Sequence, residues 1–547
     1  MDLIDSRRLT GPNLVWNHPG ALLDVAFSDG RIVDLWKEEI IELRSNLGLP
    51  DMGIQVKRRP EGAWLLVGGP VDQLYGLIET SELAWSRAMQ RLHGDSPSEP
   101  DLSLLKVELK EEENPRLIAL QKAAFQKNVT FLWDDDDVSL GMGTGSQTWP
   151  ARDLPDPSDI DWSSFHDIPV AVVTGTNGKT TTIRLLCAMA QAWGKTYGNT
   201  STDRVRVNED VLDTGDYSGP GGARTALRDQ RVEIALLETA RGGLLRRGAG
   251  IQNARVAAVL NVAEDHMGQY GINSLADLVE AKLIVQKLVS DHGLLVLNAD
   301  DPSLVEASKT FPDQRICWFS LLSETPNESV VIRNGMITAV FDGQTTAIAR
   351  VADIPITLGG KATYNVSNAL AATALAIGLG MPEEAIRTGL TSFESSFENN
   401  PGRSNYFDVR NIRVLLDYAH NPHGLKAILD TTARLGAKKR IMVLSTAGDR
   451  TETEIRDLAR VAAASGVDEV LVSDCVGYER EMGKGGVPQL LADEFAQHGM
   501  TTDQFSSELI AVREAFNRAQ AGDLLMLLVK GERMECLAEI QHQQTLD

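Results

Sequence analysis

Short apolar runs alternate with longer helical patterns along most of the chain from residue 168 onward. Each run has the length of a buried strand, and each following segment carries apolar residues at helical spacing. The runs are PVAVVTG (169–175), VEIALLE (232–238), RVAAVLNV (255–262) and GLLVLNAD (293–300), then RVLLDYA (413–419), RIMVLST (440–446), DEVLVSD (468–474) and DLLMLLVKG (523–531). This alternation is typical of parallel sheets flanked by helices. We therefore expect an α/β protein.

The first 150 residues mix strand-like and helical patterns. GAWLLVGGP (62–70) is strand-like and ends in a turn, residues 71–92 have helical spacing, and the acidic run DDDD (134–137) is expected to be a solvated loop. Two linkers, 151–165 and 393–403, divide the chain. We predict a mixed α+β N-terminal domain with its linker (1–165), a central parallel-sheet domain (166–400) and a C-terminal Rossmann-like α/β domain (401–547).

Composition narrows the class of protein. The net charge of −23 over 547 residues argues against a general nucleic-acid binder, because no excess of Lys and Arg is available to neutralise phosphates. Four widely spaced cysteines form no C-x-x-C pair, so neither a zinc site nor a disulfide framework is indicated. The N-terminus has no apolar core segment and no run approaches the roughly 18 apolar residues of a membrane span. We expect a cytoplasmic protein without membrane or nucleic-acid partners.

The segment GTNGKT follows the first apolar run and precedes a helical pattern. It has the form G-x-x-G-K-T, which is shorter than the common P-loop G-x-x-x-x-G-K-[ST]. Backbone N–H groups at the start of a helix suit phosphate oxygens, a lysine supplies charge, and a threonine hydroxyl can bind Mg²⁺. An ordinary glycine-rich turn is less favoured, because strand, loop and helix occur in the required order. The central domain is therefore predicted to be a P-loop parallel-sheet ATPase domain. The predicted nucleotide-binding residues of this loop are Gly175, Thr176, Asn177, Gly178, Lys179, Thr180 and Thr181.

Other polar residues follow the ends of predicted strands, where ligands bind in open α/β sheets. Glu238 ends one strand and could hold a second Mg²⁺, and Glu264, Asp265 and His266 follow the next. A histidine there is, taken alone, more often structural than a metal ligand. Lys282 lies among apolar residues of a helical pattern, where a lysine reaching out to solvent is the alternative. Asn298 ends a further strand, where it could bond an adenine edge or simply form a turn.

These motifs together resemble the Mur ligase family. VTGTNGKTTT is similar to that family's short ATP-binding loop, and LLETARGG, NVAEDHMG, VLNADDP, GGKATYNVSNALAA, NPGRSNY, VLLDYAHNPHGL and STAGDR follow in family order from residue 168 toward the end. Within the family, the cyanophycin synthetases are the most similar group, through RRLTGPNLVWNHPG, GDYSGPGGARTALRD and LLETARGGLLRRGAG. Their ATP-grasp domain, which joins the N-terminal domain to the Mur half, is missing between VSLGMGTGSQTWPARDLP and the P-loop.

The resemblance implies a set of site residues. Lys179 would stabilise the transferred phosphate, Lys282 would be carbamylated, and two Mg²⁺ sites would draw on Thr180, Glu238 and His266. The remaining implied nucleotide-binding residues are Asn298, Asn365, Arg403, Asp417 and His420. The weaker candidates for binding a substrate carboxylate are Ser218, Arg224 and Arg241.

The implied reaction is ATP-dependent amide formation. A carboxylate becomes an acyl phosphate, and the amine of an amino acid displaces phosphate, giving ADP and phosphate. The N-terminal domain would hold the acceptor, and the linker near residue 400 would be a hinge. A folylpolyglutamate-type ligase, a kinase and a nucleotide-binding pseudoenzyme or partner subunit are the alternatives. The loop YEREMGKGG (478–486) departs from the Arg-rich loop of cyanophycin synthetases, so the amine stays open, as does homo-oligomerisation.

Overall fold

The computed structural model describes residues 2–97, 99–322 and 328–546. The chain forms two compact units, one of residues 1–179, 189–318 and 374–385, the other of residues 180–188, 319–373 and 386–547. The division into three domains at residues 165 and 400 stays a prediction. No helix within the described ranges is long and apolar enough to cross a membrane.

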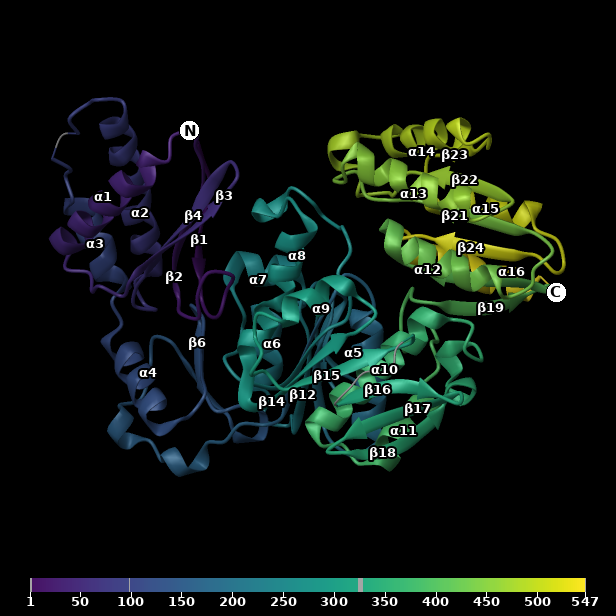
Figure 1. Cartoon of the computed structure of the whole chain (residues 1–547), viewed down its shortest axis with the longest axis horizontal. Helices are drawn as coiled ribbons and strands as arrows, with labels where there is room; N and C mark the ends of the chain where they lie inside the picture. Colours follow the sequence, from purple (N-terminus) through teal and green to yellow (C-terminus); the bar gives the residue numbers. More distant parts are fainter. Residues whose placement is uncertain (1, 98, 323–327, 547) are drawn as a thin grey trace. The chain divides into compact units, whose positions relative to one another are not determined.

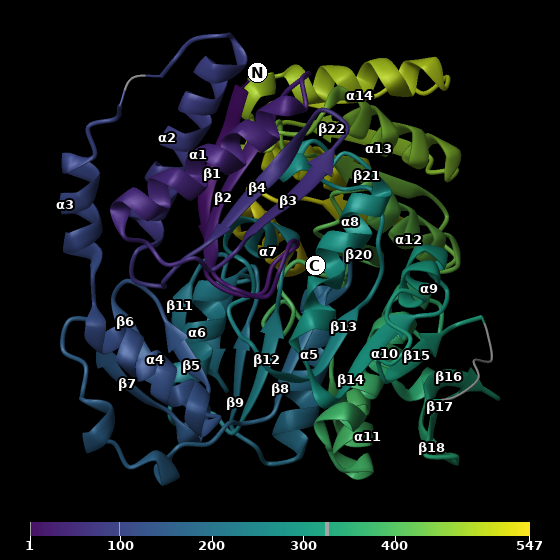
Figure 2. The same ribbon diagram turned by 60° about the vertical axis from the view of Figure 1, so that its left-hand side comes forward.

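The first unit begins with a four-stranded antiparallel sheet in the order β1-β2-β4-β3 (Figure 1). Its strands are β1 (Asp2–Leu9), β2 (Gly20–Ala26), β3 (Ile54–Arg59) and β4 (Gly62–Gly68). The helices of this region are α1 (Arg31–Leu47), α2 (Leu74–Leu92), α3 (Ser103–Glu112) and α4 (Pro115–Lys127). Helices α1 and α2 lie side by side across the sheet (Figure 2). The strand and helix expected at 62–92 are therefore confirmed.

Both faces of this N-terminal sheet are buried. Successive side chains of a strand point to opposite faces. Leu23 and Leu65 therefore join one apolar core with α1 and α2. Leu22, Trp64 and Leu66 point the other way and join a second core with the strands and helices of the following sheet. The sheet is thus a layer between two cores, which explains why β4 is buried along its whole length.

The acidic run at 134–137 lies between two strands of a small sheet formed by β5 (Phe131–Trp133), β6 (Asp137–Leu140) and β7 (Gln147–Pro150). The expectation of a solvated loop holds for the exposed Asp135 and Asp136 but not for Asp134, which is partly buried. Asp134 accepts hydrogen bonds from Arg224 (3.1 Å) and Arg228 (2.7 Å), and Asp135 pairs with Arg8. Asp134 is partnered because helix α6 (Pro220–Arg228) presents its arginines to it, and Asp135 is partnered by Arg8 of β1. Only two short 3₁₀ turns, Pro157–Asp159 and Trp162–Ser164, interrupt the linker that follows.

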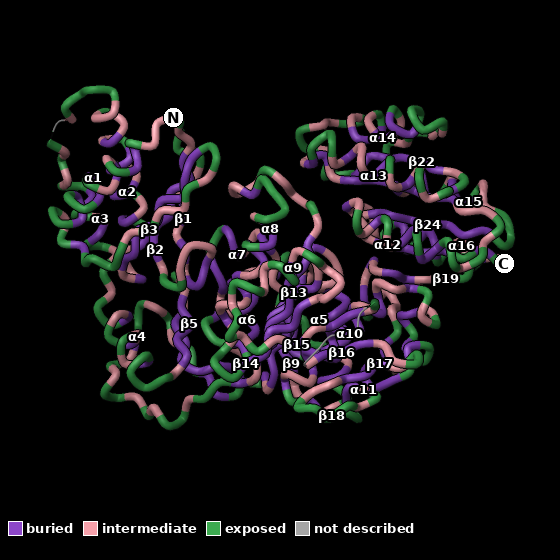
Figure 3. The backbone as a smooth tube through the Cα atoms, viewed as in Figure 1, coloured by how far each residue is buried: buried purple, intermediate pink, exposed green. Residues whose placement is uncertain are grey.

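The central sheet of the first unit runs in the order β11-β10-β9-β12-β8-β13-β14. Its strands are β8 (Val170–Thr174), β9 (Tyr197–Thr200), β10 (Arg204–Val207), β11 (Asp210–Thr214), β12 (Ile234–Glu238), β13 (Ala254–Val259) and β14 (Val289–Asn298). Strands β9, β12, β8, β13 and β14 are parallel and largely buried (Figure 3). The sheet is nevertheless mixed, because the hairpin β10–β11 adds two antiparallel edge strands.

Helices flank this sheet as expected. They are α5 (Lys179–Ala192), α6, α7 (Arg241–Arg247), α8 (Leu275–Lys282) with the 3₁₀ turn Leu283–Leu288, and α9 (Pro302–Ser308). Strand β15 (Ile316–Ser320) follows, and then the antiparallel strands β16 (Ser329–Arg333), β17 (Met336–Phe341) and β18 (Gln344–Arg350). Helices α10 (Thr363–Leu379) and α11 (Glu383–Ser392) precede the second linker, which contains no helix or strand.

The second unit contains a six-stranded sheet in the order β19-β20-β24-β21-β22-β23. Its strands are β19 (Asn405–Val409), β20 (Ile412–Asp417), β21 (Arg440–Leu444), β22 (Glu469–Ser473), β23 (Asp503–Phe505) and β24 (Leu524–Leu528). All are parallel except β19, and the helices are α12 (Pro422–Ala433), α13 (Glu452–Ala464), α14 (Gly486–Gln497), α15 (Glu508–Arg518) and α16 (Arg533–Thr545). The four predicted strands of this part, and the α/β class as a whole, are confirmed.

Candidate active site

The loop between β8 and α5 has the geometry of a phosphate-binding loop. Gly178 is the N-cap of α5 and has φ +90°, a left-handed conformation that costs glycine little and other residues more. A Cβ atom on Gly175 would lie 2.9 Å from the Cβ of Leu260, so this position also requires glycine. The Lys179 ammonium donates hydrogen bonds to the carbonyls of Gly175 (2.9 Å) and Thr176 (3.1 Å), which folds the side chain over the loop.

The segment after β13 is bonded directly to this loop. The Asn261 carboxamide accepts from Asn177 N (2.9 Å) and donates to Asn177 O (3.0 Å). The Thr176 hydroxyl donates to Ala263 O (3.1 Å) and accepts from Ala263 N (3.0 Å). Four hydrogen bonds therefore set the distance between the phosphate loop and the start of the segment that carries His266.

The end of β14 supports the same segment from its other side. Asn298 donates from its side-chain amide to Leu260 O (3.0 Å), and Asp301 accepts from Val262 N (2.8 Å). In this structure the Asn298 amide nitrogen is used for the bond to Leu260 O. The adenine contact implied for Asn298 stays a prediction.

Glu238 lies at the end of β12, beside the strand that leads into the phosphate loop. Its Cα is in register with that of Val173 on β8, and the residue is 2% exposed. No group of three His, Cys, Asp or Glu residues suited to a metal occurs among the described residues. Mg²⁺ usually takes one or two protein oxygens and completes its shell with water and phosphate oxygens. A buried carboxylate beside the loop and the Thr180 hydroxyl in the first turn of α5 are such donors.

Lys282, the last residue of α8, is 5% exposed. Burial is the main cause that lowers its pKa from 10.5 to about 7. The positive charges of Lys179 and Arg241 lower the pKa further, and the carboxylate of Asp265 opposes them. The solvent-exposed alternative for this lysine is therefore wrong. Lys282 lies within electrostatic reach of the phosphate-loop lysine and is largely a neutral amine above pH 7.

His266 belongs to a loop that we define as residues 263–272. His266 and Tyr270 both have left-handed backbones, with φ of 53° and 52°, which is uncommon for residues other than glycine. Arg241, at the start of α7, donates to His266 O (2.8 Å) and to the Gln269 side chain (3.1 Å). Arg241 thus supports the loop, and its implied role in binding a substrate carboxylate stays a prediction.

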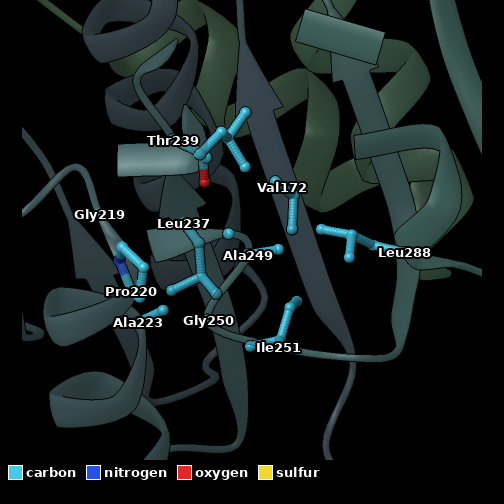
Figure 4. A pocket seen from close by; sticks show the side chains of 12 residues that line it. Val172, Gly219, Pro220, Ala223, Leu237, Thr239, Ala249, Gly250, Ile251 and Leu288 are labelled. Carbon is cyan, nitrogen blue, oxygen red and sulfur yellow. The ribbon is translucent and has the colours of Figure 1, made fainter. Parts of the chain in front are cut away.

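The other two weak substrate candidates are engaged in local contacts. The Ser218 hydroxyl donates to Asp216 (2.5 Å), and Ser218 O accepts from Ala240 N (2.8 Å). Arg224 is paired with Asp134. A small apolar pocket lies beside Ser218, lined by Val172, Leu237, Ile251 and neighbouring residues (Figure 4). Its lining contains no charged side chain, so it offers nothing for a phosphate or a carboxylate.

The second unit carries the remaining implied nucleotide residues. Asp417, at the end of β20, is 8% exposed and accepts from Ser404 N (2.7 Å) and Ala419 N (2.7 Å). Burial raises the pKa of this carboxyl against the effect of those hydrogen bonds. Arg403 and Arg533 both lie over the ring of Tyr418, at 5.2 and 5.4 Å from its centre.

Three further residues of that unit have defined contacts. The buried Asn365 donates from its side-chain amide to Ile356 O (3.0 Å). His420 donates from Nδ1 to Tyr418 O (3.2 Å). Thr181 accepts a hydrogen bond of 3.4 Å from Asn400. The nucleotide contacts of these residues stay predictions.

Sequence reasoning missed several residues that shape the site. Asn261 could have been found, because it follows the end of β13 closely, where ligands bind in such sheets. Asp301 was included only within the motif VLNADDP, and Asp265 was noted without its electrostatic role toward Lys282. Arg533 carries no local signal, because its approach to Tyr418 depends on the fold of the C-terminal sheet.

Comparison with known proteins identifies the class. The family model of the Mur ligase middle domain matches residues 173–376. The family model described as "Mur ligase, glutamate ligase domain" matches residues 402–533. The two matches together span more than half of the chain. The chain belongs to the Mur ligase family, a family of ATP-dependent acid–amino acid ligases.

Within this family the chain is similar to cyanophycin synthetases. It is 32% identical over 528 residues to that of Synechocystis sp., covering 92% of this chain and 56% of that protein. It is 35% identical over 378 residues to that of Nostoc sp., covering 66% and 41%. The chain thus spans about half the length of these relatives. The structure of E. coli FolC in complex with DHPP and ADP has the same fold over 69% of this chain and 89% of that one, with a TM-score of 0.52 and 19% identity.

Proposed function

We propose that this chain joins a carboxylate to the amine of an amino acid through an acyl phosphate formed from ATP. The observation that carries the proposal is the cluster of Lys179, Arg241 and Lys282 with Asp265 beside the phosphate loop. Attack of a carboxylate on the γ-phosphate brings two anions together. The two cations of this cluster, Lys179 and Arg241, are preorganised near the loop and offset that repulsion.

The first step forms a bond between a carboxylate oxygen and the γ-phosphorus and breaks the bond to the β-phosphate, so ADP leaves. Lys179 and the backbone N–H groups at the start of α5 bind the phosphate oxygens and orient them for in-line attack. The amine then attacks the acyl carbon, loses a proton, and the tetrahedral intermediate expels phosphate. The protein's contribution is mainly positioning and charge stabilisation.

Glu238, the Thr180 hydroxyl and His266 would hold Mg²⁺. When bound, Mg²⁺ supplies charge neutralisation of the phosphate oxygens. Lys282 has the chemistry for carbamylation: a neutral amine attacks CO₂ and loses one proton, which leaves an anionic carbamate on the side chain. Its lowered pKa supports this assignment, because a protonated lysine has no free electron pair.

An isotope experiment tests the reaction directly. The purified chain is incubated with ATP and Mg²⁺ in a matrix of amino acids and small carboxylates, and products are read by mass spectrometry. For a productive pair, the carboxylate is labelled with ¹⁸O. If an acyl phosphate forms, one ¹⁸O atom of the carboxylate must appear in the released phosphate. Direct hydrolysis of ATP by water leaves the released phosphate unlabelled.

Matched lysine variants complete the test. Lys179→Ala should abolish product formation, while Lys195→Ala, which removes a surface lysine paired with Glu233, should not. Release of unlabelled phosphate without any amide product contradicts the proposal. Nucleotide binding with no turnover for any substrate pair supports the pseudoenzyme alternative.

A further inference from the structure

The conspicuous motif RRLTGPN at residues 7–13 has no role in the proposed chemistry, yet it makes specific contacts with the central sheet's helices. Arg7 donates from Nε to Leu245 O (3.0 Å), and Thr10 N donates to Arg247 O (2.7 Å), both at the end of α7. Asn13 O accepts from the Lys287 ammonium (2.7 Å). The motif therefore fastens the N-terminal sheet to α7, the helix that begins at Arg241.

The N-terminal sheet also contacts the loop 263–272, through Arg59 and Trp64. Asp24, 2% exposed, is paired with Arg59 and accepts from Trp64 Nε1 (2.9 Å). A Cβ atom placed on Gly271 would lie 2.0 Å from Arg59 Nη1 and 2.9 Å from the Trp64 ring. Gly271 also has φ +70°. The loop thus favours glycine here for its backbone conformation, and the Arg59 guanidinium occupies the space that a side chain would fill.

The loop is held on several sides. Its first residue is bonded to Thr176 of the phosphate loop, and Arg241 holds His266 O. The Arg7 guanidinium lies over the ring of Tyr270, 5.5 Å from its centre. The two left-handed non-glycine residues of the loop carry a conformational cost, so contacts from outside are needed to keep this conformation. The N-terminal sheet supplies such contacts.

The same sheet also reaches α8. Lys57 on β3 forms an ion pair with Glu280, two residues before Lys282. Because the pair is partly exposed, its own contribution is small, but Leu278 and Ile272 share the apolar core that contains Leu22 and Trp64. The N-terminal sheet thereby contacts both the loop 263–272, which carries His266, and helix α8, which carries Lys282.

We propose that Arg59 is a positioning residue, through which the N-terminal sheet fixes the loop carrying His266 relative to the phosphate loop. The inference rests on the proposed function for its link to catalysis. It makes the N-terminal region a structural support of the ATP site in addition to any role in holding the acceptor. Arg59 acts through its close approach to Gly271.

Arg59→Lys is the informative variant, because lysine keeps a positive charge for the buried Asp24 but loses the guanidinium nitrogen that packs against Gly271. Tyr270→Leu is the second variant and leaves the Asp24 pair untouched. Arg58→Lys is the matched control: Arg58 is exposed on the same strand and points to the opposite face, toward the start of α1.

The first measurement needs no turnover. Hydrogen exchange followed by mass spectrometry should show faster exchange within 263–272 in Arg59→Lys and Tyr270→Leu, with Arg58→Lys like the natural chain. Mn²⁺ affinity in the presence of a non-hydrolysable ATP analogue should fall about tenfold, as is typical when a residue supporting a metal site is lost. Affinity for the analogue alone should be unchanged, because the phosphate loop is held by its own strand.

Activity supplies the second measurement. Both variants should need about tenfold more Mg²⁺ for half-maximal turnover at an unchanged KM for ATP, and saturating Mg²⁺ should restore most of kcat. Unchanged exchange and Mn²⁺ affinity in both variants would overturn the positioning role. If the natural chain shows no ligation at all, the proposed function fails, while the exchange and Mn²⁺ results still decide this inference.

Discussion

Lys282 offers the sharpest test of the site, through its replacement by methionine. Methionine has a similar length and keeps the apolar contacts, but it carries no amine. The variant should bind ATP as before, because Lys282 lies on α8 and not on the phosphate loop. It should lose ligation, and a small carboxylate such as acetate should restore part of it by occupying the place of the carbamate.

The lowered pKa sets the size of the effect. With a pKa of about 7, about 90% of the Lys282 side chains are neutral at pH 8, whereas an ordinary lysine with a pKa of 10.5 would be about 0.3% neutral. Burial and the nearby charges of Lys179 and Arg241 together therefore raise the neutral fraction of Lys282 roughly 300-fold at pH 8. Between pH 6 and pH 8 the neutral fraction rises about tenfold, and carbamate formation and turnover should rise with it.

The same shift affects folding. The unfolded chain binds more protons than the folded one between pH 7 and 10.5, so Lys282 makes the folded state less stable as the pH falls through that range. Relative to the natural chain, Lys282→Met should gain unfolding free energy below pH 7. That gain should shrink by about 1.4 kcal/mol per pH unit above pH 7.

Two measurements check this reasoning. Carbon-13 NMR with labelled bicarbonate should show a carbamate signal in the natural chain and none in Lys282→Met, while Lys309→Met, which alters an exposed lysine, should leave the signal unchanged. Denaturant unfolding at several pH values gives the free energies. A carbamate signal that survives in Lys282→Met, or a stability difference that does not vary with pH, would refute the assignment.

The remaining predictions concern the loops around the site. Asn261→Ala removes two hydrogen bonds to the phosphate loop, so ATP affinity measured by calorimetry should fall by about 1–3 kcal/mol, or roughly 5- to 150-fold, while Asn253→Ala should have no effect. Asp134→Ala leaves two partly buried arginines without this carboxylate partner, so the unfolding free energy should fall by about 1–3 kcal/mol. Asp136→Ala, which alters an exposed residue, should change the unfolding free energy little. Burial raises the pKa of Asp134, but Arg228 and backbone hydrogen bonds outweigh it, so this contribution should be lost only as the pH falls below about 4.

The elements that could be predicted from sequence are those whose signal is local. Parallel strands buried on both faces read as continuous apolar runs, so β8, β12, β13 and β14 are visible in the sequence. The position of Lys179, Glu238 and Asn298 at strand ends follows from the general placement of ligands in such sheets. Burial of Lys282 was the less favoured reading before the family resemblance, because a lysine at the end of an apolar helix usually extends to solvent.

Features that depend on distant partners could not be predicted in this way. The edge hairpin β10–β11 has few apolar residues and turns at Asn208, a left-handed residue without a distinctive motif. The acidic run at 134–137 looks like a solvated loop until α6 supplies its arginines. Likewise, the second buried face of the N-terminal sheet is recognisable only once its partners, more than 200 residues away, are known.

That separation has a consequence for how the chain is made. Strands β1 to β4 are complete when residue 68 has been synthesised, but their partners on α7 and at Lys287 are about 180 to 220 residues further along. At 5–20 residues per second, the face bearing Leu22, Trp64 and Leu66 stays uncovered for on the order of tens of seconds. During that interval it is a site for chaperones, or for association between nascent chains. A gene fragment ending before residue 241 would lack α7 and would leave this surface without that partner permanently.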